Sequence, residues 1–139
     1  MVPTKVTPGE IARTNPRPTL IEPFRAASVV LVFTLDLGAV AATDLDLDRI
    51  GVIAGASIYP LVWNVLLGAR QAGFGGTIST MAVAEEPKVK ELLGVPDDHA
   101  ICAVVPLGKP RKQLTNLRRR SVDGFVTRER YDGERFALS

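Results

Sequence analysis

A chain of 139 residues with 46% hydrophobic and 23% charged residues suffices for one modest globular core, and this composition excludes a disordered chain. The formal net charge is only +2, so any basic surface is local rather than spread over the whole molecule. A single cysteine, Cys102, excludes an intrachain disulfide framework and suits a reducing compartment. The first residues lack the apolar run of a signal peptide, so we expect a cytoplasmic protein.

The start of the chain is rich in proline. Residues 1–26 contain five of the ten prolines, Pro3, Pro8, Pro16, Pro18 and Pro23. Each proline fixes its own φ and disfavours the helical conformation in the residue before it. We therefore expect residues 1–26 to form an extended arm.

The rest of the chain alternates between apolar runs and turn residues. The run 28–35 has no polar alternation and predicts a strand covered on both faces. A glycine-rich turn at 74–80 is expected to lead into a short strand. We expect a helix over 85–93 that ends at Gly94, and a further strand over 100–107. Ser121 is placed to cap a short helix that ends at Val126, before a polar tail at 127–139.

An acidic stretch comes after the first strand. Thr43 and Asp46 have the spacing of a capping box, and the acidic side chains suit the positive end of a helix. The alternation of aspartates also resembles a calcium-binding loop, but Arg49 stands where such a loop needs glycine. The stretch therefore favours a helix start.

The segment 50–69 is twenty residues long and uncharged. Its length suits a bilayer span, whereas Asn64 and Pro60 favour a helix at the centre of a soluble core or of a dimer. We expect one long helix over 46–72, bent or broken at Pro60 and ended by Gly73.

Four pieces, in this order, resemble the nitroreductase family. Residues 56–76 are similar to the central helix of that family and the turn after it. Residues 91–100 and the strand end 106–110 are similar to the next segments of the family's chain, and the basic residues 117–122 occupy the place of its C-terminal phosphate-binding motif. The resemblance covers about residues 27–126.

The resemblance implies an α+β sandwich fold in which a mixed or antiparallel sheet packs on a long central helix. It implies an FMN enzyme that passes electrons from NADH or NADPH to nitroaromatics, quinones or similar small acceptors. It also implies an intimate homodimer, in which the uncharged helix is buried rather than inserted in a membrane. The expected division is an arm at 1–26, a truncated nitroreductase-like core at 27–126 and a tail at 127–139.

The family's motifs carry over onto two groups of residues in this chain. The glycine turn and the strand entry after it would approach the flavin ring, and two arginines would hold its phosphate, with Arg119 as a competitor for that role. The residues so implied are Gly75, Gly76, Ser79, Thr80, Met81, Arg118 and Arg120. A solvated basic loop or a nucleic-acid patch is the alternative for 109–120, but this stretch lacks aromatics for stacking bases. We expect no nucleic-acid partner.

Other features depart from a family member's site. Arg13 and Arg17 have the spacing of the family's N-terminal arginine motif, but the prolines around them do not fit it, and about a third of the domain is expected to be absent. A non-catalytic dimerisation or binding protein is therefore the alternative function.

The remaining residues of interest have simpler interpretations. Tyr59 and Trp63 are interpreted first as core residues and second as neighbours of the flavin or partner subunit. No catalytic acid, base or metal site is predicted, and His99 is interpreted as a turn residue.

Overall fold

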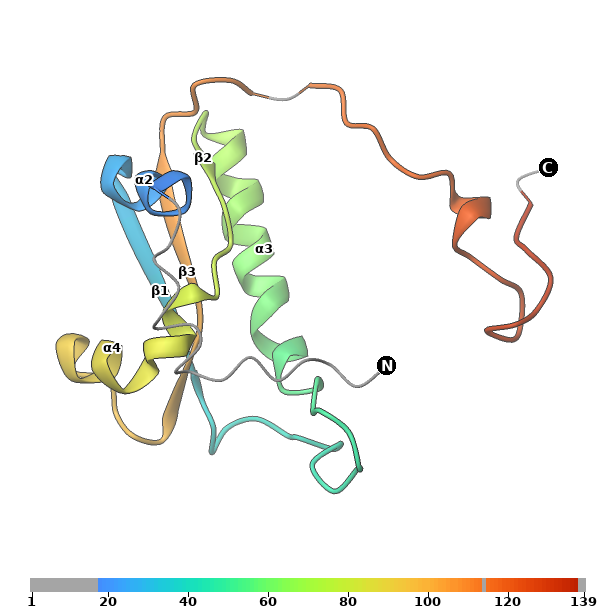
Figure 1. Cartoon of the computed structure of the whole chain (residues 1–139), viewed down its shortest axis with the longest axis horizontal. Helices are drawn as coiled ribbons and strands as arrows, with labels where there is room; N and C mark the ends of the chain where they lie inside the picture. Colours follow the sequence, from blue (N-terminus) through green and yellow to red (C-terminus); the bar gives the residue numbers. More distant parts are fainter. Residues whose placement is uncertain (1–17, 114, 138–139) are drawn as a thin grey trace.

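The computed structural model describes residues 18–113 and 115–137, and it shows an α+β fold in which one long helix packs on a small antiparallel sheet (Figure 1). The sheet has the strand order β1-β3-β2, so the last strand in sequence lies in the middle. The elements are β1 (Val29–Asp36), α3 (Gly55–Gln71), β2 (Gly75–Gly76) and β3 (His99–Gly108). The predicted fold class is confirmed. The arginine spacing at 13 and 17 lies outside the described residues.

The core lies between α3 and the central strand. Ile58 and Val62, one turn apart on α3, pack against Ala103 and Val105, which alternate on one face of β3. Val62 and Val105 have no exposed surface. The fully buried core is small, and partly buried residues complete it: Leu31, Phe33, Leu35, Leu66, Ile78, Cys102 and Leu107.

A bulge interrupts the pairing of β1 with β3. Phe33 is opposite Ala103 and Thr34 is opposite Ile101, so Cys102 is an extra residue without a partner on β1. The Cys102 carbonyl instead accepts a hydrogen bond of 3.3 Å from the Tyr59 hydroxyl of α3. The bulge thus ties the central strand to the long helix.

The long helix is shorter than predicted at its start. It begins at Gly55 rather than Asp46, and residues 37–54 form a loop of turns and bends, so the predicted capping box is wrong. The buried carboxylate of Asp44 holds this loop by accepting hydrogen bonds from the Arg49 guanidinium, at 2.7 Å, and from the Val52 N–H, at 2.8 Å. These bonds hold the segment from Asp44 to Val52 as a loop, where the spacing of Thr43 and Asp46 had predicted the start of a helix.

The end of the long helix matches the prediction. Gly73 has φ of 85°, and the N–H groups of Gly73 and Phe74 donate to the carbonyls of Arg70 and Ala69. This pair of bonds is a Schellman motif, which requires a left-handed residue that glycine adopts without strain. The helix runs through Pro60 without a break, so of the predicted bend or break at Pro60 the break is wrong and the bend stays a prediction.

Two short helices pack against the first half of β3. A 3-10 helix, η1 (Met81–Glu85), leads into α4 (Glu86–Leu93), which ends at Gly94 with φ of 65°, as predicted. Glu86 accepts a hydrogen bond of 2.6 Å from the buried N–H of Ile101. The start of α4 is therefore fastened directly to the central strand.

Two expectations for the N-terminal part are wrong where the structure describes it, and the arm expected over 1–17 lies outside the described residues. Residues Pro18–Ala26 form the helix α2 rather than an extended arm, because Pro18 occupies the first turn, where a missing N–H costs nothing. Strand β1 is an edge strand and is not covered on both faces, since Val29 is 50% exposed in the described chain.

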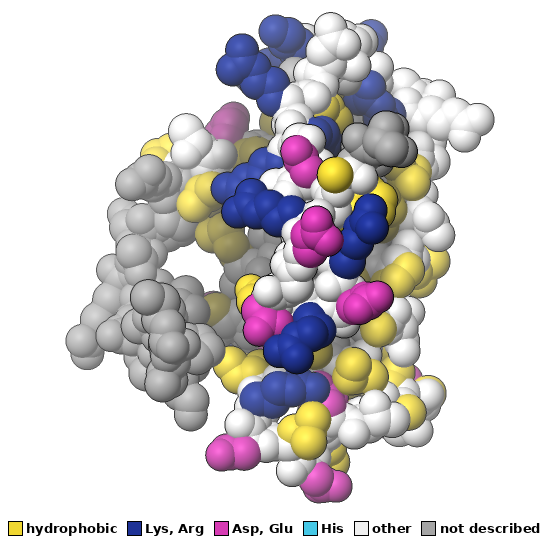
Figure 2. Space-filling view, turned by 90° about the vertical axis from the view of Figure 1, so that its right-hand side faces the viewer, with side chains coloured by type: hydrophobic (Ala, Val, Ile, Leu, Met, Phe, Trp, Pro, Cys, Tyr) yellow, Lys and Arg dark blue, Asp and Glu magenta, His cyan; other side chains and the backbone are white. Residues whose placement is uncertain are grey.

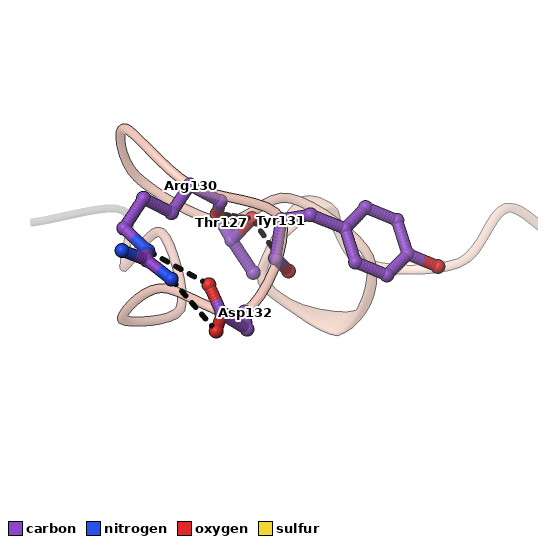
Figure 3. A network of polar contacts seen from close by, with 4 residues as sticks. All are labelled: Thr127, Arg130, Tyr131 and Asp132. Atoms are coloured by element: carbon purple, nitrogen blue, oxygen red, sulfur yellow. Dashed lines mark hydrogen bonds and ion pairs between the residues drawn. The ribbon is translucent and has the colours of Figure 1, made fainter.

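The C-terminal segment leaves the body and runs outward as an extended chain (Figure 1). The predicted helix over 121–126 is only a 3-10 turn, η2 (Val122–Gly124), and Ser121 makes no side-chain cap bond. Beyond it a small hairpin forms, in which Thr127 pairs with Arg135. The Thr127 hydroxyl donates to the Arg130 carbonyl at 2.6 Å, and Arg130 pairs with Asp132 (Figure 3).

No helix of the described residues is both long enough and apolar enough to cross a membrane. The uncharged segment becomes helical only at Gly55, and it continues into a charged end at Arg70.

Candidate functional site

The described residues form a groove of about 880 Å³ where the ends of α2, α3, β2 and β3 meet the first part of the C-terminal segment. Four kinds of surface line it: the side of α3, the glycine pair of β2, the end of β3 and the basic stretch after it. The groove is therefore built from parts of the sequence that lie far apart along the chain.

The glycine pair is the floor of this groove. Gly75 lies opposite Gly108, and Gly76 lies opposite Leu107. A Cβ on Gly76 would lie 2.5 Å from Leu107 Cδ2 and 2.9 Å from Leu66 Cδ2, which is closer than real side chains approach. Glycine thus lets β2 pack closely against Leu107 of the central strand and Leu66 of α3, and a larger residue would displace these leucine side chains.

One wall of the groove is a face of α3. This face carries a single stripe of side chains that lines the groove. Its members either adjoin one another or lie three or four residues apart on the helix, and they are Trp63, Leu66, Leu67 and Arg70. Phe74, just after the helix, extends this wall. The interpretation of Tyr59 and Trp63 as core residues is wrong for the described chain, because their side chains are 41% and 55% exposed.

Basic side chains also line the groove. Lys109, Lys112 and Arg119 line the groove, and of these the sequence had indicated only Arg119, as a competitor for the phosphate. Lys109 comes directly after Gly108, which pairs with Gly75 of the floor. The basic run after a strand was visible in the sequence, but the pairing that brings its first lysine to the glycine turn was not.

The structure brings some of the predicted site residues into the groove and leaves others outside its lining. Gly75 and Gly76 form the floor. Ser79 bridges to Val104 farther along the central strand, and its hydroxyl accepts a hydrogen bond of 3.3 Å from the N–H of Met81. Thr80 and Met81 begin η1, and Arg118 and Arg120 flank the lining residue Arg119. Contacts of all seven predicted residues with a flavin stay predictions.

Titratable groups elsewhere in the described chain do not form a second buried site. Asp36, Asp98 and His99 bring their ligand atoms within 4.8 Å of one another, but both carboxylates are exposed. The hydrogen bond from His99 lowers the pKa of Asp98. Burial raises the pKa of the Cys102 thiol, so its reactive thiolate form is disfavoured. On the face shown in Figure 2, Lys and Arg side chains gather at the top, and basic and acidic side chains are interspersed over the middle.

Comparison with known proteins agrees with this architecture. Nitroreductase A from Vibrio parahaemolyticus RIMD 2210633 has a TM-score of 0.62 and 24% identity over 82% of this chain and 53% of its own. The NADPH:FMN oxidoreductase from Vibrio harveyi, solved with NAD+, has a TM-score of 0.62 and 24% identity over 84% of this chain and 55% of its own. The chain thus spans about half the length of these structures, and the likeness concerns the fold. No curated protein matches the chain.

The family match is carried by the sequence as well as by the fold. Residues 18–109 match the Nitroreductase family, and they include α2, the whole sheet, α3, α4 and Lys109. The matched part is more than half of the chain, and it contains the floor of the groove and its apolar wall. The protein belongs to the nitroreductase family.

Proposed function

We propose that this protein is an FMN-dependent oxidoreductase that takes electrons from NADH or NADPH and passes them to a nitroaromatic, quinone or similar small acceptor. The observation that carries the proposal is the groove, in which an apolar wall, a glycine floor and a row of cations meet. The family match supports flavin chemistry in general, while the acceptor and the choice of nicotinamide are part of the proposal.

The residues of the groove suit two parts of FMN, its ring and its phosphate. The apolar stripe from Trp63 to Leu67 suits the flavin ring, because planar apolar ligands bind against apolar and aromatic walls. Lys109 and Lys112 suit the phosphate, because a doubly charged anion needs fixed cations. Gly75 lies against Pro110, which also lines the groove. We therefore assign the phosphate first to the lysines, with Arg118 and Arg120 as the alternative predicted from the sequence.

A bound flavin supplies the hydride and electron chemistry itself, so the protein needs no catalytic acid, base or nucleophile. The contribution of the chain is to bind, to orient and to exclude water. The apolar wall made by Trp63, Leu66 and Leu67 would remove water from one side of the ring. The cations would fix the phosphate end and thereby the position of the ring.

The test is a titration of the purified protein with FMN, followed by an assay of nicotinamide oxidation. We expect saturable flavin binding, seen as a change in visible absorbance, and oxidation of NADH or NADPH that depends on a quinone or nitroaromatic acceptor. Flavin binding without such turnover would favour the alternative of a non-catalytic binding protein. Protein that binds no FMN would contradict the proposal.

We further propose that the functional form is a homodimer. The loop before α3 and the first half of that helix expose several large apolar side chains, namely Leu45, Leu47, Ile50, Val52, Ile53, Tyr59 and Leu61. So many exposed apolar groups beside so small a core are typical of a surface that another subunit covers. The cytoplasmic location stays a prediction.

The dimer is tested by the molecular mass in solution. We expect the wild-type protein to have the mass of two chains, and Leu61→Arg to shift it to one chain, because a charge at this half-exposed position opposes burial in an interface. A wild-type protein that is monomeric at every concentration would contradict the dimer without affecting the flavin titration.

A further inference from the structure

The segment 79–86 is tied to the central strand at both of its ends. At its start, the backbones of Ser79 and Val104 exchange two hydrogen bonds, of 3.0 and 2.8 Å. At its end, the Glu86 carboxylate accepts the hydrogen bond of 2.6 Å from the N–H of Ile101. Ile101 and Val104 both belong to β3, so the two ends of the segment rest on the same part of one strand.

The bonds made between these ends are local. The Val83 N–H donates to the Thr80 carbonyl at 3.1 Å, and the Met81 N–H donates to the Ser79 hydroxyl at 3.3 Å. Such bonds fix the shape of a turn but not its place on a sheet. The place of Thr80 and Met81 therefore depends on how η1 packs against β3 and on the two tied ends of the segment.

The segment continues from the groove and contains predicted flavin contacts. Thr77, two residues before Ser79, lines the groove. Thr80 and Met81, which the sequence predicts to approach the flavin ring, are exposed and can be reached by a ligand. Backbone donors stabilise the charge of a reduced ring only when the structure around them holds them in place.

We propose that Glu86 is a positioning residue of the flavin site, and that its bond to the Ile101 N–H holds the backbone of Thr80 and Met81 where the ring binds. The inference rests on the proposed FMN function. Glu86 acts through the segment and needs no contact with the cofactor. Ile101 is 2% exposed, so its N–H has no water to replace a lost carboxylate.

The test measures the Kd of FMN and of riboflavin, which has the same ring but no phosphate, together with the visible absorbance spectrum of each bound flavin. Glu86→Ala is expected to raise both Kd values by the same factor, roughly three- to tenfold, and to alter both spectra, because the lost support concerns the ring. Glu86→Gln keeps an acceptor for the Ile101 N–H, so we expect it to stay within about twofold of wild type.

The matched control is Gly94→Ala, at the other end of α4. Gly94 has φ of 65°, where alanine is strained, and nothing lies within 4 Å of its Cβ position. This variant destabilises the same helix and leaves the Glu86 bond intact, so both Kd values and both spectra should remain those of the wild type. Equal effects in Gly94→Ala and Glu86→Ala would show a general loss of helix stability and would overturn the inference.

Two further results would overturn the inference while the proposed function stands. One is an unchanged Kd and spectrum of both flavins in Glu86→Ala, and the other is a loss in Glu86→Gln as large as that in Glu86→Ala. If circular dichroism shows that Glu86→Ala does not fold, Glu86→Asp decides, because its shorter side chain draws the carboxylate back from Ile101. Wild-type affinity of Glu86→Asp for both flavins would then overturn the inference. A wild-type protein that binds neither flavin would instead contradict the proposed function itself.

Discussion

At the scale of single residues, Gly76 gives a packing constraint at the junction of β2, β3 and α3. Gly76→Ala would place a Cβ against Leu107, Leu66 and the backbone carbonyl of Pro106, the last at 3.0 Å. Such overpacking costs typically about 1–3 kcal/mol, and we expect this loss in chemical denaturation. Gly68→Ala is the control, because nothing lies within 4 Å of its Cβ position on α3 and alanine favours a helix. Equal stability of the two variants would contradict the packing described for β2.

Asp44 predicts how stability depends on pH. The pKa of Asp44 is lowered, first by the hydrogen bond from the Val52 N–H and then by Arg49. The stabilisation that Asp44 provides is therefore present above its unfolded pKa, about 3.9, and is lost as pH falls through its folded pKa. We expect Asp44→Asn to be less stable than wild type at about pH 7, and the difference to shrink in acid. Thermal unfolding measures this, with the exposed Asp48→Asn as control. A difference that does not change with pH would show that the loop is held in another way.

At the scale of elements, the connection between α4 and the central strand depends on one carboxylate. Ile101 is buried, and its N–H donates to Glu86 rather than to a strand neighbour. Glu86→Ala would leave this N–H unpaired, at a cost of about 1–3 kcal/mol, whereas Glu86→Gln keeps an acceptor and should cost less. Glu91→Ala, at an exposed position of the same helix, is the control for lost charge. Chemical denaturation ranks the three variants, and no loss in Glu86→Ala would contradict this contact.

The same elements show what the sequence could predict. The sequence correctly predicted the helix ends at Gly73 and Gly94 and the apolar strand at 100–107. These features were found because glycine at a helix end and a run of apolar residues are local signals. The start of α3 was missed because Asp44 bonds to Val52, eight residues away, and periodicity does not report such a bond. The bulge at Cys102 was also invisible, because it exists only relative to the register of β1.

At the scale of the whole molecule, the fold class and the glycine floor of the site were predictable, whereas most of its cations were not. Gly75 and Gly76 belong to a recognisable helix–turn segment. Lys109 joins them only because β3 pairs with β2 across a gap in the sequence that contains η1 and α4. The sequence instead favoured Arg118 and Arg120 by their place in the order of motifs, and the lining of the groove contains neither.

The affinity of FMN for two paired variants tests the central claim most directly. One variant combines Lys109→Gln with Lys112→Gln, and the other combines Arg118→Gln with Arg120→Gln, so the two lose the same charge. We expect the lysine variant to raise the Kd of FMN about tenfold or more, because it loses hydrogen bonds to the charged phosphate. We expect the arginine variant to leave the Kd close to that of the wild type. The reverse result, or equal affinity in both variants, would contradict a flavin phosphate held in this groove.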